Sequence, residues 1–420
     1  MSTVNQAFTV KEQAMKAQKA SKLLAILSTE EKNAALNTIA DRLEQEYAII
    51  LTANEVDLDA GRKQNFDDAF MDRLALTKER IFEFAQGLRD VANLEDPTGI
   101  VQSDWELENG IQVEQVTVPL GVIGMIYEAR PNVTVDATGL ALKSGNAVVL
   151  KGGSSAIASN KAIVDIMRTA LEDTRIPVEA VQFIDSTDRE ATKQLFTMKQ
   201  HIDVLIPRGG ESLINTVVEN ATVPVLETGV GNCHLYIDKE ANVDQAINIF
   251  INAKTDRPAV CNAVETLIVH KEWLDANQDT LVKAMLEHGI HAHADEYAHS
   301  LIPGADEATE EDWANEYLSR DVAVKTVEDV LEAIEHIEIY GTKHSEAIIT
   351  ENDKTANTFL KLIDAAALYH NASTRFTDGG AMGFGAEIGI STQKLHARGP
   401  MGLPALTTIK YIMKGTGQTR

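Results

Sequence analysis

A cysteine in a polar segment with basic neighbours is the strongest candidate for chemistry in this sequence. Cys261 lies in the run from Lys254 to Ala263, 34 positions after Glu227. A thiol attacks an acyl or aldehyde carbon as its thiolate, which requires a pKa below the free value of about 8.5. We expect the positive charges of Lys254 and Arg257 to favour the thiolate. The segment therefore predicts a covalent nucleophile, and the alternative is a buried structural thiol.

The second cysteine, Cys233, is the rival nucleophile because His234 follows it directly. Neighbouring side chains on a strand point to opposite faces, so these two are not expected to hydrogen-bond. We interpret Cys233 as core packing. A Cys-dependent hydrolase would need a histidine base near Cys261, and the sequence offers only His270, at the far end of the next predicted strand.

Composition limits the classes of function. With 420 residues, 44% of them apolar, the chain predicts two or more packed domains. Its 38 basic and 63 acidic residues give a net charge of −25, which disfavours nucleic acid and anionic membranes as partners. No apolar run is long enough to span a membrane and no signal-peptide core is present, so we expect a cytoplasmic protein. No Cys or His spacing is typical of a zinc site, and no metal is predicted.

The stretch that opens the chain is predicted to be helical. Residues 5–95 carry apolar positions at helical spacing, and Ser28 with Glu31 forms a capping-box pattern. The Asn109-Gly110 pair before a strand-like run at 111–118 then predicts a β-hairpin. A hairpin projecting between helical regions often serves as an assembly arm.

Two series of short apolar runs alternate with helical stretches and predict parallel sheets covered on both faces. The first series comprises residues 122–127, 147–150, 181–184 and 204–206. Such units bind nucleotides at the ends of their strands. The second series comprises residues 235–237, 266–269, 322–325 and 347–350, and it predicts a second domain that contains Cys261. We interpret the acidic stretch 288–316 as a solvated surface loop, and 405–413 as a final strand.

Four motifs in order carry a resemblance to a known family: Arg130-Pro131-Asn132, Lys151-Gly152-Gly153-Ser154, Leu226-Glu227-Thr228-Gly229 and Cys261. Together they resemble the aldehyde dehydrogenase superfamily. Within it, the chain is similar over nearly its whole length to γ-glutamyl phosphate reductases, through the runs 127–136, 206–210, 254–263 and 396–402. The resemblance implies an α/β fold with two Rossmann-like parallel-sheet domains and a small β oligomerisation arm.

The resemblance also implies a reaction, the NADPH-dependent reduction of L-glutamyl 5-phosphate to L-glutamate 5-semialdehyde and phosphate in proline biosynthesis. Cys261 would form a thioester that accepts the hydride. Asn132 matches the donor to the oxyanion, and a turn or helix-cap asparagine is the alternative. Glu227 matches the general base of relatives that hydrolyse their thioester. Since phosphate release needs no hydrolysis, Glu227 would move a proton at Cys261 or support its loop.

Residues that would bind NADP(H) follow from the same resemblance: Lys151, Ser154, Pro207, Arg208, Gly209, Gly210 and Glu316. Lys151 would reach ribose or phosphate oxygens, with a solvated strand-end lysine as the alternative. NAD-preferring relatives often have a glutamate where this chain has Ser154, so room for a 2′-phosphate favours NADPH. The amides of 207–210 would face the cofactor phosphates at the start of a helix. Glu316 would hold the nicotinamide ribose, or it is a surface carboxylate.

The substrate carries an acyl phosphate and an α-carboxylate, which need cations in an acidic protein. Arg257, Arg375 and Arg398 are the candidates, and a structural salt bridge is the alternative for each. The arm implies a homo-oligomer. The 420 residues leave no room for the kinase to which some relatives are fused, so the resemblance implies a stand-alone enzyme, with glutamate 5-kinase as a possible channelling partner.

The expected NADP-binding domain comprises residues 1–104 and 122–226, with 369–399. The catalytic domain comprises residues 227–368, and the arm comprises 105–121 and 400–420. Two other classes of function remain open. One is a non-catalytic protein on the same scaffold, against which the set Asn132, Lys151, Glu227 and Cys261 argues. The other is a related enzyme with a different substrate, such as a CoA-acylating aldehyde dehydrogenase.

Overall fold

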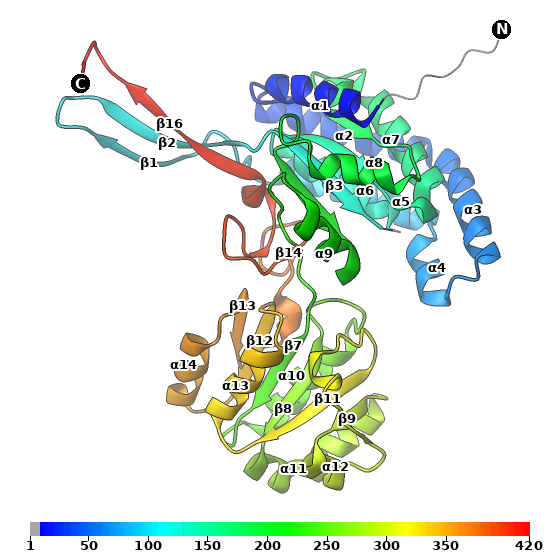
Figure 1. Cartoon of the computed structure of the whole chain (residues 1–420), viewed down its shortest axis with the longest axis vertical. Coiled ribbons are helices and arrows are strands. Elements are labelled where there is room, and N and C mark those ends of the chain that lie inside the picture. Colours follow the sequence, from blue (N-terminus) through cyan, green and yellow to red (C-terminus); the bar gives the residue numbers. More distant parts are fainter. Residues whose placement is uncertain (1–8, 129) are drawn as a thin grey trace. The chain divides into compact units, whose positions relative to one another are not determined.

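The computed structural model describes residues 9–128 and 130–420, and the chain divides into two compact units. Unit 1 contains the chain up to Glu227 together with Phe384–Gly389 and Met401–Arg420, and unit 2 contains Thr228–Gly383 and Ile390–Pro400 (Figure 1). The start of the predicted cofactor domain at 1–8, and Ala129 of the 127–136 motif, lie outside the described residues. In the described part of the chain, no helix combines the length and apolar character needed to cross a membrane.

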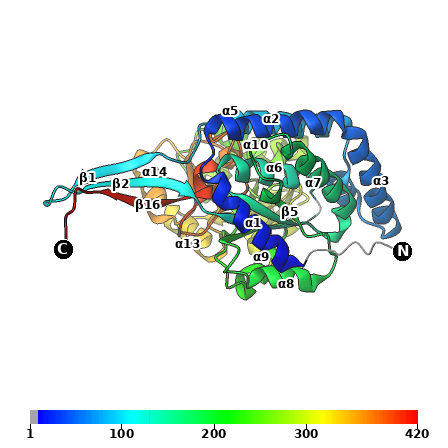
Figure 2. The ribbon, with the colours of Figure 1, turned by 90° about the horizontal axis from the view of Figure 1, so that it is seen from above.

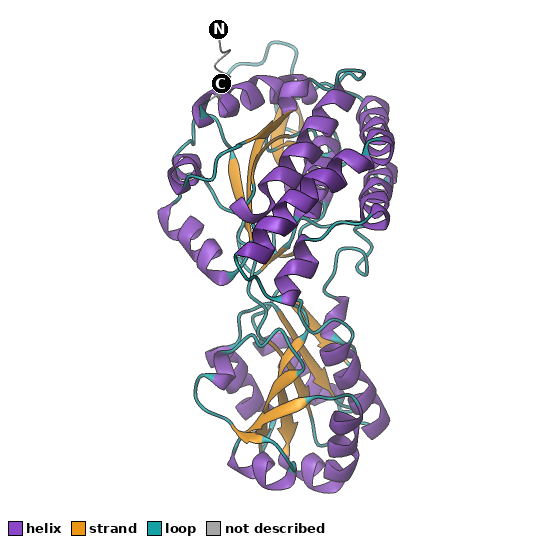
Figure 3. Cartoon of the chain, turned by 90° about the vertical axis from the view of Figure 1, so that its right-hand side faces the viewer, coloured by secondary structure: helices purple, strands orange, loops and turns teal. Residues whose placement is uncertain are grey.

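Unit 1 is built on a four-stranded parallel sheet in the order β5-β4-β3-β6. Its strands are β3 (Val122–Tyr127), β4 (Ala147–Lys151), β5 (Val181–Phe183) and β6 (Val204–Arg208). Helices surround this sheet (Figure 3). They are α1 (Val10–Leu24), α2 (Thr29–Gln45), α3 (Tyr47–Lys63), α4 (Asp68–Leu74), α5 (Lys78–Asn93), α6 (Pro131–Lys143), α7 (Ile157–Leu171), α8 (Arg189–Phe196) and α9 (Glu211–Asn220). The four strands coincide with the first predicted series, because β3, β4 and β5 are buried along their whole length and therefore read as uninterrupted apolar runs.

Local sequence signals set the boundaries of several helices in unit 1. The capping box predicted at Ser28 and Glu31 is confirmed, since each side chain accepts a hydrogen bond from the other's backbone amide. α2 and α5 lie side by side across one face of the unit (Figure 2). Pro131 occupies the first position of α6, where its missing amide hydrogen costs nothing.

A three-stranded antiparallel sheet in the order β1-β2-β16 forms the arm. Its strands are β1 (Val101–Glu106), β2 (Gln112–Pro119) and β16 (Thr407–Lys414). The predicted hairpin is confirmed, with Gly110 at a φ of 82° in the turn. A three-residue loop that ends in a left-handed residue favours glycine there. The predicted final strand is confirmed as β16, and the ring of its Tyr411 lies 6.2 Å from that of Trp105.

Unit 2 contains a seven-stranded parallel sheet in the order β10-β9-β11-β8-β7-β12-β13. Its strands are β7 (Cys233–Ile237), β8 (Val264–His270), β9 (His291–Ala294), β10 (Asp306–Glu307), β11 (Asp321–Val327), β12 (Ser345–Ile349) and β13 (Ala367–His370). The helices are α10 (Val243–Thr255), α11 (Lys271–Glu287), α12 (Glu296–Leu301), α13 (Val330–Tyr340) and α14 (Asp353–Leu362). Two buried clusters pack on this sheet, one around Phe250 and Trp273 and one around Tyr236 and Phe359.

The interpretation of 288–316 as a solvated loop is wrong. This stretch forms β9, α12 and β10. β9 reads His-Ala-His-Ala, with both alanines buried and both histidines partly exposed. Alanine is small, so the inward face of β9 carries none of the bulky apolar residues by which strands are recognised.

The boundary between the units also differs from the predicted one, since the chain up to Gly383 stays with unit 2 rather than leaving it at 369. β13 pairs with β12 in parallel, and the turn that follows is bound to the same sheet. Thr377 Oγ1 lies 2.6 Å from Ser345 Oγ and 2.8 Å from Tyr369 Oη. These hydroxyl contacts hold 374–377 against the sheet of unit 2.

Candidate active site

Cys261 lies in the loop between α10 and β8 and is partly buried. The predicted core packing of Cys233 is confirmed, since its side chain is buried at the start of β7. Cys233 Sγ donates to the carbonyl oxygen of Cys261 at 3.1 Å, and it also lies 3.6 Å from His344 Nδ1. Burial raises the pKa of Cys233 well above its usual value, so it stays a neutral donor. The second thiol therefore supports the backbone of the first.

Gly231 allows the chain before β7 to pass close to Cys261. A Cβ atom at Gly231 would lie 1.6 Å from the carbonyl oxygen of Cys261, so only glycine fits. Its amide donates to Glu316 Oε1 at 2.9 Å. Glu316 therefore lies in unit 2, beside the loop of Cys261, whereas the other residues predicted to bind the cofactor belong to unit 1.

Asn262 anchors the nucleophile loop on its other side. Its side-chain nitrogen Nδ2 donates to the backbone carbonyl oxygen of Thr377 at 2.9 Å, and its backbone carbonyl oxygen accepts from Thr374 Oγ1 at 2.7 Å. The guanidinium of Arg375 contacts Asn262 Oδ1 and lies 3.1 Å from Asp256. Arg375 thus bridges the two ends of the loop. This is the structural salt bridge that the sequence left open as the alternative to substrate binding.

Lys254 and Glu265 form an ion pair with both side chains fully buried and 2.6 Å between Nζ and Oε2. Burial lowers the pKa of Lys254, and burial raises the pKa of Glu265 to about 7. The expectation that Lys254 favours the Cys261 thiolate needs correction, because its charge is balanced by a carboxylate that the sequence did not single out.

The other two candidate arginines differ in their surroundings. Arg398 lies 2.7 Å from Asp364, which also pairs with Lys394 at 2.8 Å. These two cations hold the pKa of Asp364 at about 2. Arg257 is exposed, and we find no ion pair for it within residues 9–128 and 130–420. Of the three, only Arg257 presents an unengaged guanidinium next to Cys261 in sequence.

In unit 1, the residues predicted to bind the cofactor gather at the carboxyl edge of the sheet. β3 ends at Tyr127, β4 ends at Lys151 and β6 ends at Arg208, and β3 lies between the other two. Lys151 is buried, and its Nζ donates to the carbonyl oxygen of Gly152 at 2.9 Å. Burial lowers the pKa of Lys151. Ser154 follows in an exposed turn ahead of α7.

The start of α9 differs from the predicted phosphate site. Glu128 Oε2 accepts from the amide of Gly210 at 3.2 Å, and a Cβ atom at Gly209 would lie 2.7 Å from Cδ of the same glutamate. The amide of Gly210 is therefore not open to a phosphate, because a carboxylate of unit 1 already binds it. Pro207 and Arg208 are β6 residues paired with Ile126 and Tyr127 of β3.

Asn132 occupies the second position of α6 and is not its cap, since the N-cap residue is Arg130. Its amide nitrogen donates to Asp136 Oδ2, one turn later, at 3.1 Å. This bond leaves one amide hydrogen of Asn132 for a ligand and fixes which end of the amide carries it. Asp136 and Glu128 belong to the 127–136 motif, yet their roles depend on long-range contacts that sequence spacing does not give.

Comparison with known proteins places this geometry in a family context. The aldehyde dehydrogenase family model matches residues 2–320. A γ-glutamyl phosphate reductase 2 from Bacillus licheniformis is 66% identical over 411 residues, covering 98% of this chain and 97% of the relative. A γ-glutamyl phosphate reductase from Bacillus cereus is 55% identical, covering 97% and 98%. The crystal structure of a γ-glutamyl phosphate reductase from Thermotoga maritima superposes with a TM-score of 0.96 at 47% identity, covering 98% of this chain and all of that one.

Proposed function

This chain belongs to the aldehyde dehydrogenase family, and on that premise we propose that it reduces L-glutamyl 5-phosphate to L-glutamate 5-semialdehyde and phosphate. The reaction is the second step of proline biosynthesis from glutamate. The observation that carries the proposal is the similarity to γ-glutamyl phosphate reductases at 66% and 55% identity over nearly the whole chain. The anchored loop of Cys261 supports it independently.

Cys261 is the proposed nucleophile. Its sulfur attacks the acyl carbon, a C–S bond forms, and the C–O bond to phosphate breaks with its electron pair on the phosphate. The thioester left on Cys261 is a good hydride acceptor because sulfur donates little resonance to the carbonyl. Hydride addition gives a hemithioacetal, and its collapse to the aldehyde returns the sulfur to Cys261. Cys233, which is buried and donates to the backbone of Cys261, holds this loop in place.

Asn132 is the proposed donor to the oxyanion that develops in both tetrahedral species. Its bond to Asp136 supports this role, because the amide is held with one hydrogen still available. Glu227 is the proposed proton carrier for Cys261. Arg257, exposed and four residues before the nucleophile, is the proposed partner of the substrate phosphate. Arg375 and Arg398 already form ion pairs with Asp256 and Asp364. We therefore propose that they act by stabilising the loops in which they lie.

Members of this family use a nicotinamide cofactor, which would supply the hydride. The carboxyl edge of the unit 1 sheet fits such a group, because the glycines there have no side chain between the backbone and a ligand. A Cβ atom at Gly152 would lie 2.4 Å from Asn160 Nδ2, and one at Gly153 would lie 3.4 Å from the backbone of Glu128. Lys151, Ser154 and Arg208 offer a charge or a hydroxyl at this edge. We infer that NADPH is preferred, because no carboxylate stands at Ser154 to repel a 2′-phosphate.

Unit 1 is the proposed cofactor domain and unit 2 is the proposed catalytic domain. Glu316, in unit 2, is proposed to bind the nicotinamide ribose through its carboxylate. The β1-β2-β16 sheet is the proposed oligomerisation arm of a homo-oligomer. A glutamate 5-kinase is the proposed channelling partner, because it makes the unstable acyl phosphate. The cytoplasm is the proposed location, in keeping with bacterial relatives.

The reverse reaction tests the function. The full-length protein is mixed with glutamate 5-semialdehyde and NADP⁺, and NADPH absorbance is followed without added acceptor, with inorganic phosphate, and with coenzyme A. We expect turnover only with phosphate. Turnover without an acceptor would identify a hydrolytic aldehyde dehydrogenase with Glu227 as its base, and turnover with coenzyme A alone would identify an acylating one.

Truncation of Asn132 tests the oxyanion donor. Asn132→Ala should lower kcat by about 10²- to 10³-fold with little change in KM, because a donor aimed at the oxyanion acts mainly in the transition state. Steady-state kinetics of the reverse reaction measure this. Asn215→Ala, on the exposed face of α9, is the control and should keep wild-type kinetics. A tenfold rise in KM with unchanged kcat would instead assign Asn132 to ground-state binding.

The cofactor preference is tested at Ser154. Ser154→Glu should lower kcat/KM for NADPH by about 10-fold, since a charge about 4 Å from the 2′-phosphate is repulsive by 1 kcal/mol or more. The value for NADH should change little. Thr52→Glu, on the exposed face of α3, adds the same charge elsewhere in unit 1 and should affect neither cofactor. Equal losses for both cofactors would argue that Ser154 does not face the 2′ position.

A further inference from the structure

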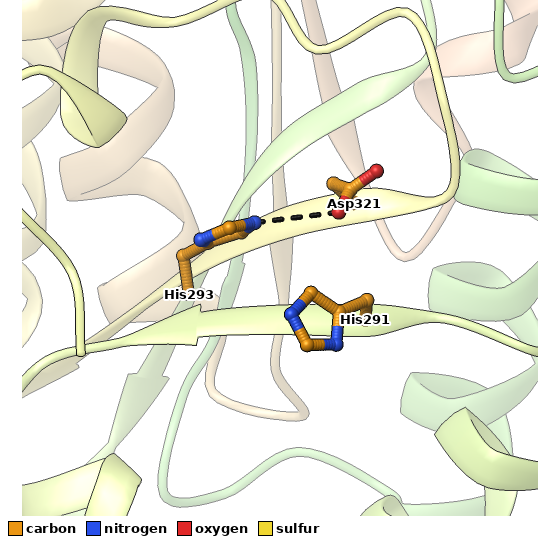
Figure 4. A group of neighbouring side chains, drawn as sticks. All are labelled: His291, His293 and Asp321. Carbon is orange, nitrogen blue, oxygen red and sulfur yellow. Dashed lines mark hydrogen bonds and ion pairs between the residues drawn. The ribbon is translucent and has the colours of Figure 1, made fainter. Parts of the chain in front are cut away.

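Three metal-binding side chains lie together near one edge of the unit 2 sheet. His291 and His293 belong to β9, and Asp321 begins the neighbouring strand β11. One ligand atom from each residue lies within 4.8 Å of the other two. Figure 4 shows His293 linked to Asp321, with His291 on the same strand beside them.

The strand geometry explains this grouping. Side chains two residues apart on a strand point to the same face, so both imidazoles leave β9 together while Ala292 and Ala294 face the core. β11 runs parallel to β9 with Asp321 directly opposite His291. The carboxylate is therefore brought to the imidazoles by backbone pairing in the sheet.

Neighbouring groups hold the two imidazoles in orientation. The ring of His293 stacks on Tyr317 at 5.1 Å, and its Nδ1 lies 3.7 Å from Asp312 Oδ1. His291 Nε2 lies 2.7 Å from Asp306 Oδ2 on the other neighbouring strand, β10. Carboxylates that orient histidine rings in this way are the usual outer partners of metal sites.

The cluster is open to solvent and electrostatically suited to a cation. The side chains of His291, His293 and Asp321 are 43%, 20% and 36% exposed. Asp306 and Asp312 add negative charge beside them, on a protein whose net charge is −25.

We propose that His291, His293 and Asp321 bind one divalent transition-metal ion of the zinc class, outside the site of the proposed reaction and independently of it. Two imidazoles with one carboxylate suit Zn²⁺ and its neighbours, whereas Mg²⁺ and Ca²⁺ take oxygen ligands. Metal–ligand distances of about 2.0–2.2 Å require the three ligand atoms to close by roughly 1 Å, which small side-chain rotations supply. The ion replaces the hydrogen bond between His293 and Asp321, and its remaining position is left for water.

Calorimetric titration of the full-length, chelator-treated protein with ZnCl₂ near neutral pH tests this. The catalytic thiol is a competing ligand, so the titration is repeated in Cys261→Ser. We expect one ion per chain in both proteins. His291→Asn and His293→Asn, made separately, should weaken binding at least about 100-fold, and Asp306→Asn should weaken it about 10-fold as an outer partner.

His370→Asn is the matched control, because His370 is an exposed histidine on the opposite edge strand of the same sheet. It should bind Zn²⁺ like the wild type. Circular dichroism confirms that each variant is folded. The proposal is overturned by any of three results: no binding to the wild type, binding that is lost in Cys261→Ser, or binding that survives both histidine substitutions.

Discussion

Cys261→Ser should reduce turnover by at least about 10⁴-fold, because a serine hydroxyl ionises far less readily than a thiol and makes a poorer leaving group in the collapse step. A second readout separates chemistry from binding. In the reverse direction without phosphate, the wild type should release one NADPH per active site in a burst and keep a glutamyl group on Cys261. The variant should show neither the burst nor the mass increase on the 254–263 peptide.

Cys233→Ser is the control for this experiment. A serine hydroxyl can donate to the carbonyl oxygen of Cys261 as the thiol does, so activity should stay within about 10-fold of wild type, the loss reflecting a neutral hydrogen bond of about 1 kcal/mol. The opposite pattern, an inactive Cys233→Ser with an active Cys261→Ser, would exchange the roles of the two thiols.

Lys254→Met should lower the free energy of unfolding of unit 2 by about 3–5 kcal/mol, since it leaves the carboxylate of Glu265 buried without its partner. Adding Glu265→Met should recover most of the loss, because two apolar side chains of similar volume need no ion pair. Denaturant unfolding followed by tryptophan fluorescence measures this, as Trp273 and Trp313 both lie in unit 2.

Lys271→Met is the control for the buried pair. Lys271 lies 3.0 Å from Glu328 in an exposed pair of the same unit, and its loss should change stability little. A double variant no more stable than Lys254→Met would show that packing, and not the lone charge, causes the loss.

The wild type should also show a pH dependence with a defined sign. Burial raises the pKa of Glu265 to about 7, so the folded state holds this proton more tightly than the unfolded state. The stability from this group is fully present below about pH 4.5, the ordinary value, and is lost as the pH rises through about 7. Unfolding of the Lys254→Met/Glu265→Met variant should lack that loss.

Sequence reasoning located the strands where burial on both faces left continuous apolar runs, as in β3 and β4. It failed at β9, where alanines form the inward face and histidines the outward one. It also ended unit 2 too early, because the contacts of Thr377 with Ser345 and Tyr369 join residues separated in sequence by other elements.

The candidate site shows the same division. Motif order singles out Cys261, Asn132 and Lys151 as candidates, and their roles stay predictions. The partners that define their surroundings were not predictable, because Glu265 reaches Lys254 and Glu128 reaches Gly210 only after the chain has folded. Charge near a cysteine in sequence is therefore a weak guide to the field at its sulfur.

The strands of the arm cannot all pair at the same stage of protein synthesis. β2 pairs with β1 almost as soon as both are made, but its other partner is β16, and Lys414 reaches Glu114 across 300 positions of sequence. At about 5–20 residues per second, a ribosome needs roughly 15–60 s to cover that interval. Throughout it one edge of the nascent hairpin has no strand beside it, and all seven strands of the unit 2 sheet are synthesised before that edge can be paired. When β16 is finally made, it pairs with an edge of β2 that has been unpaired for most of the chain's translation.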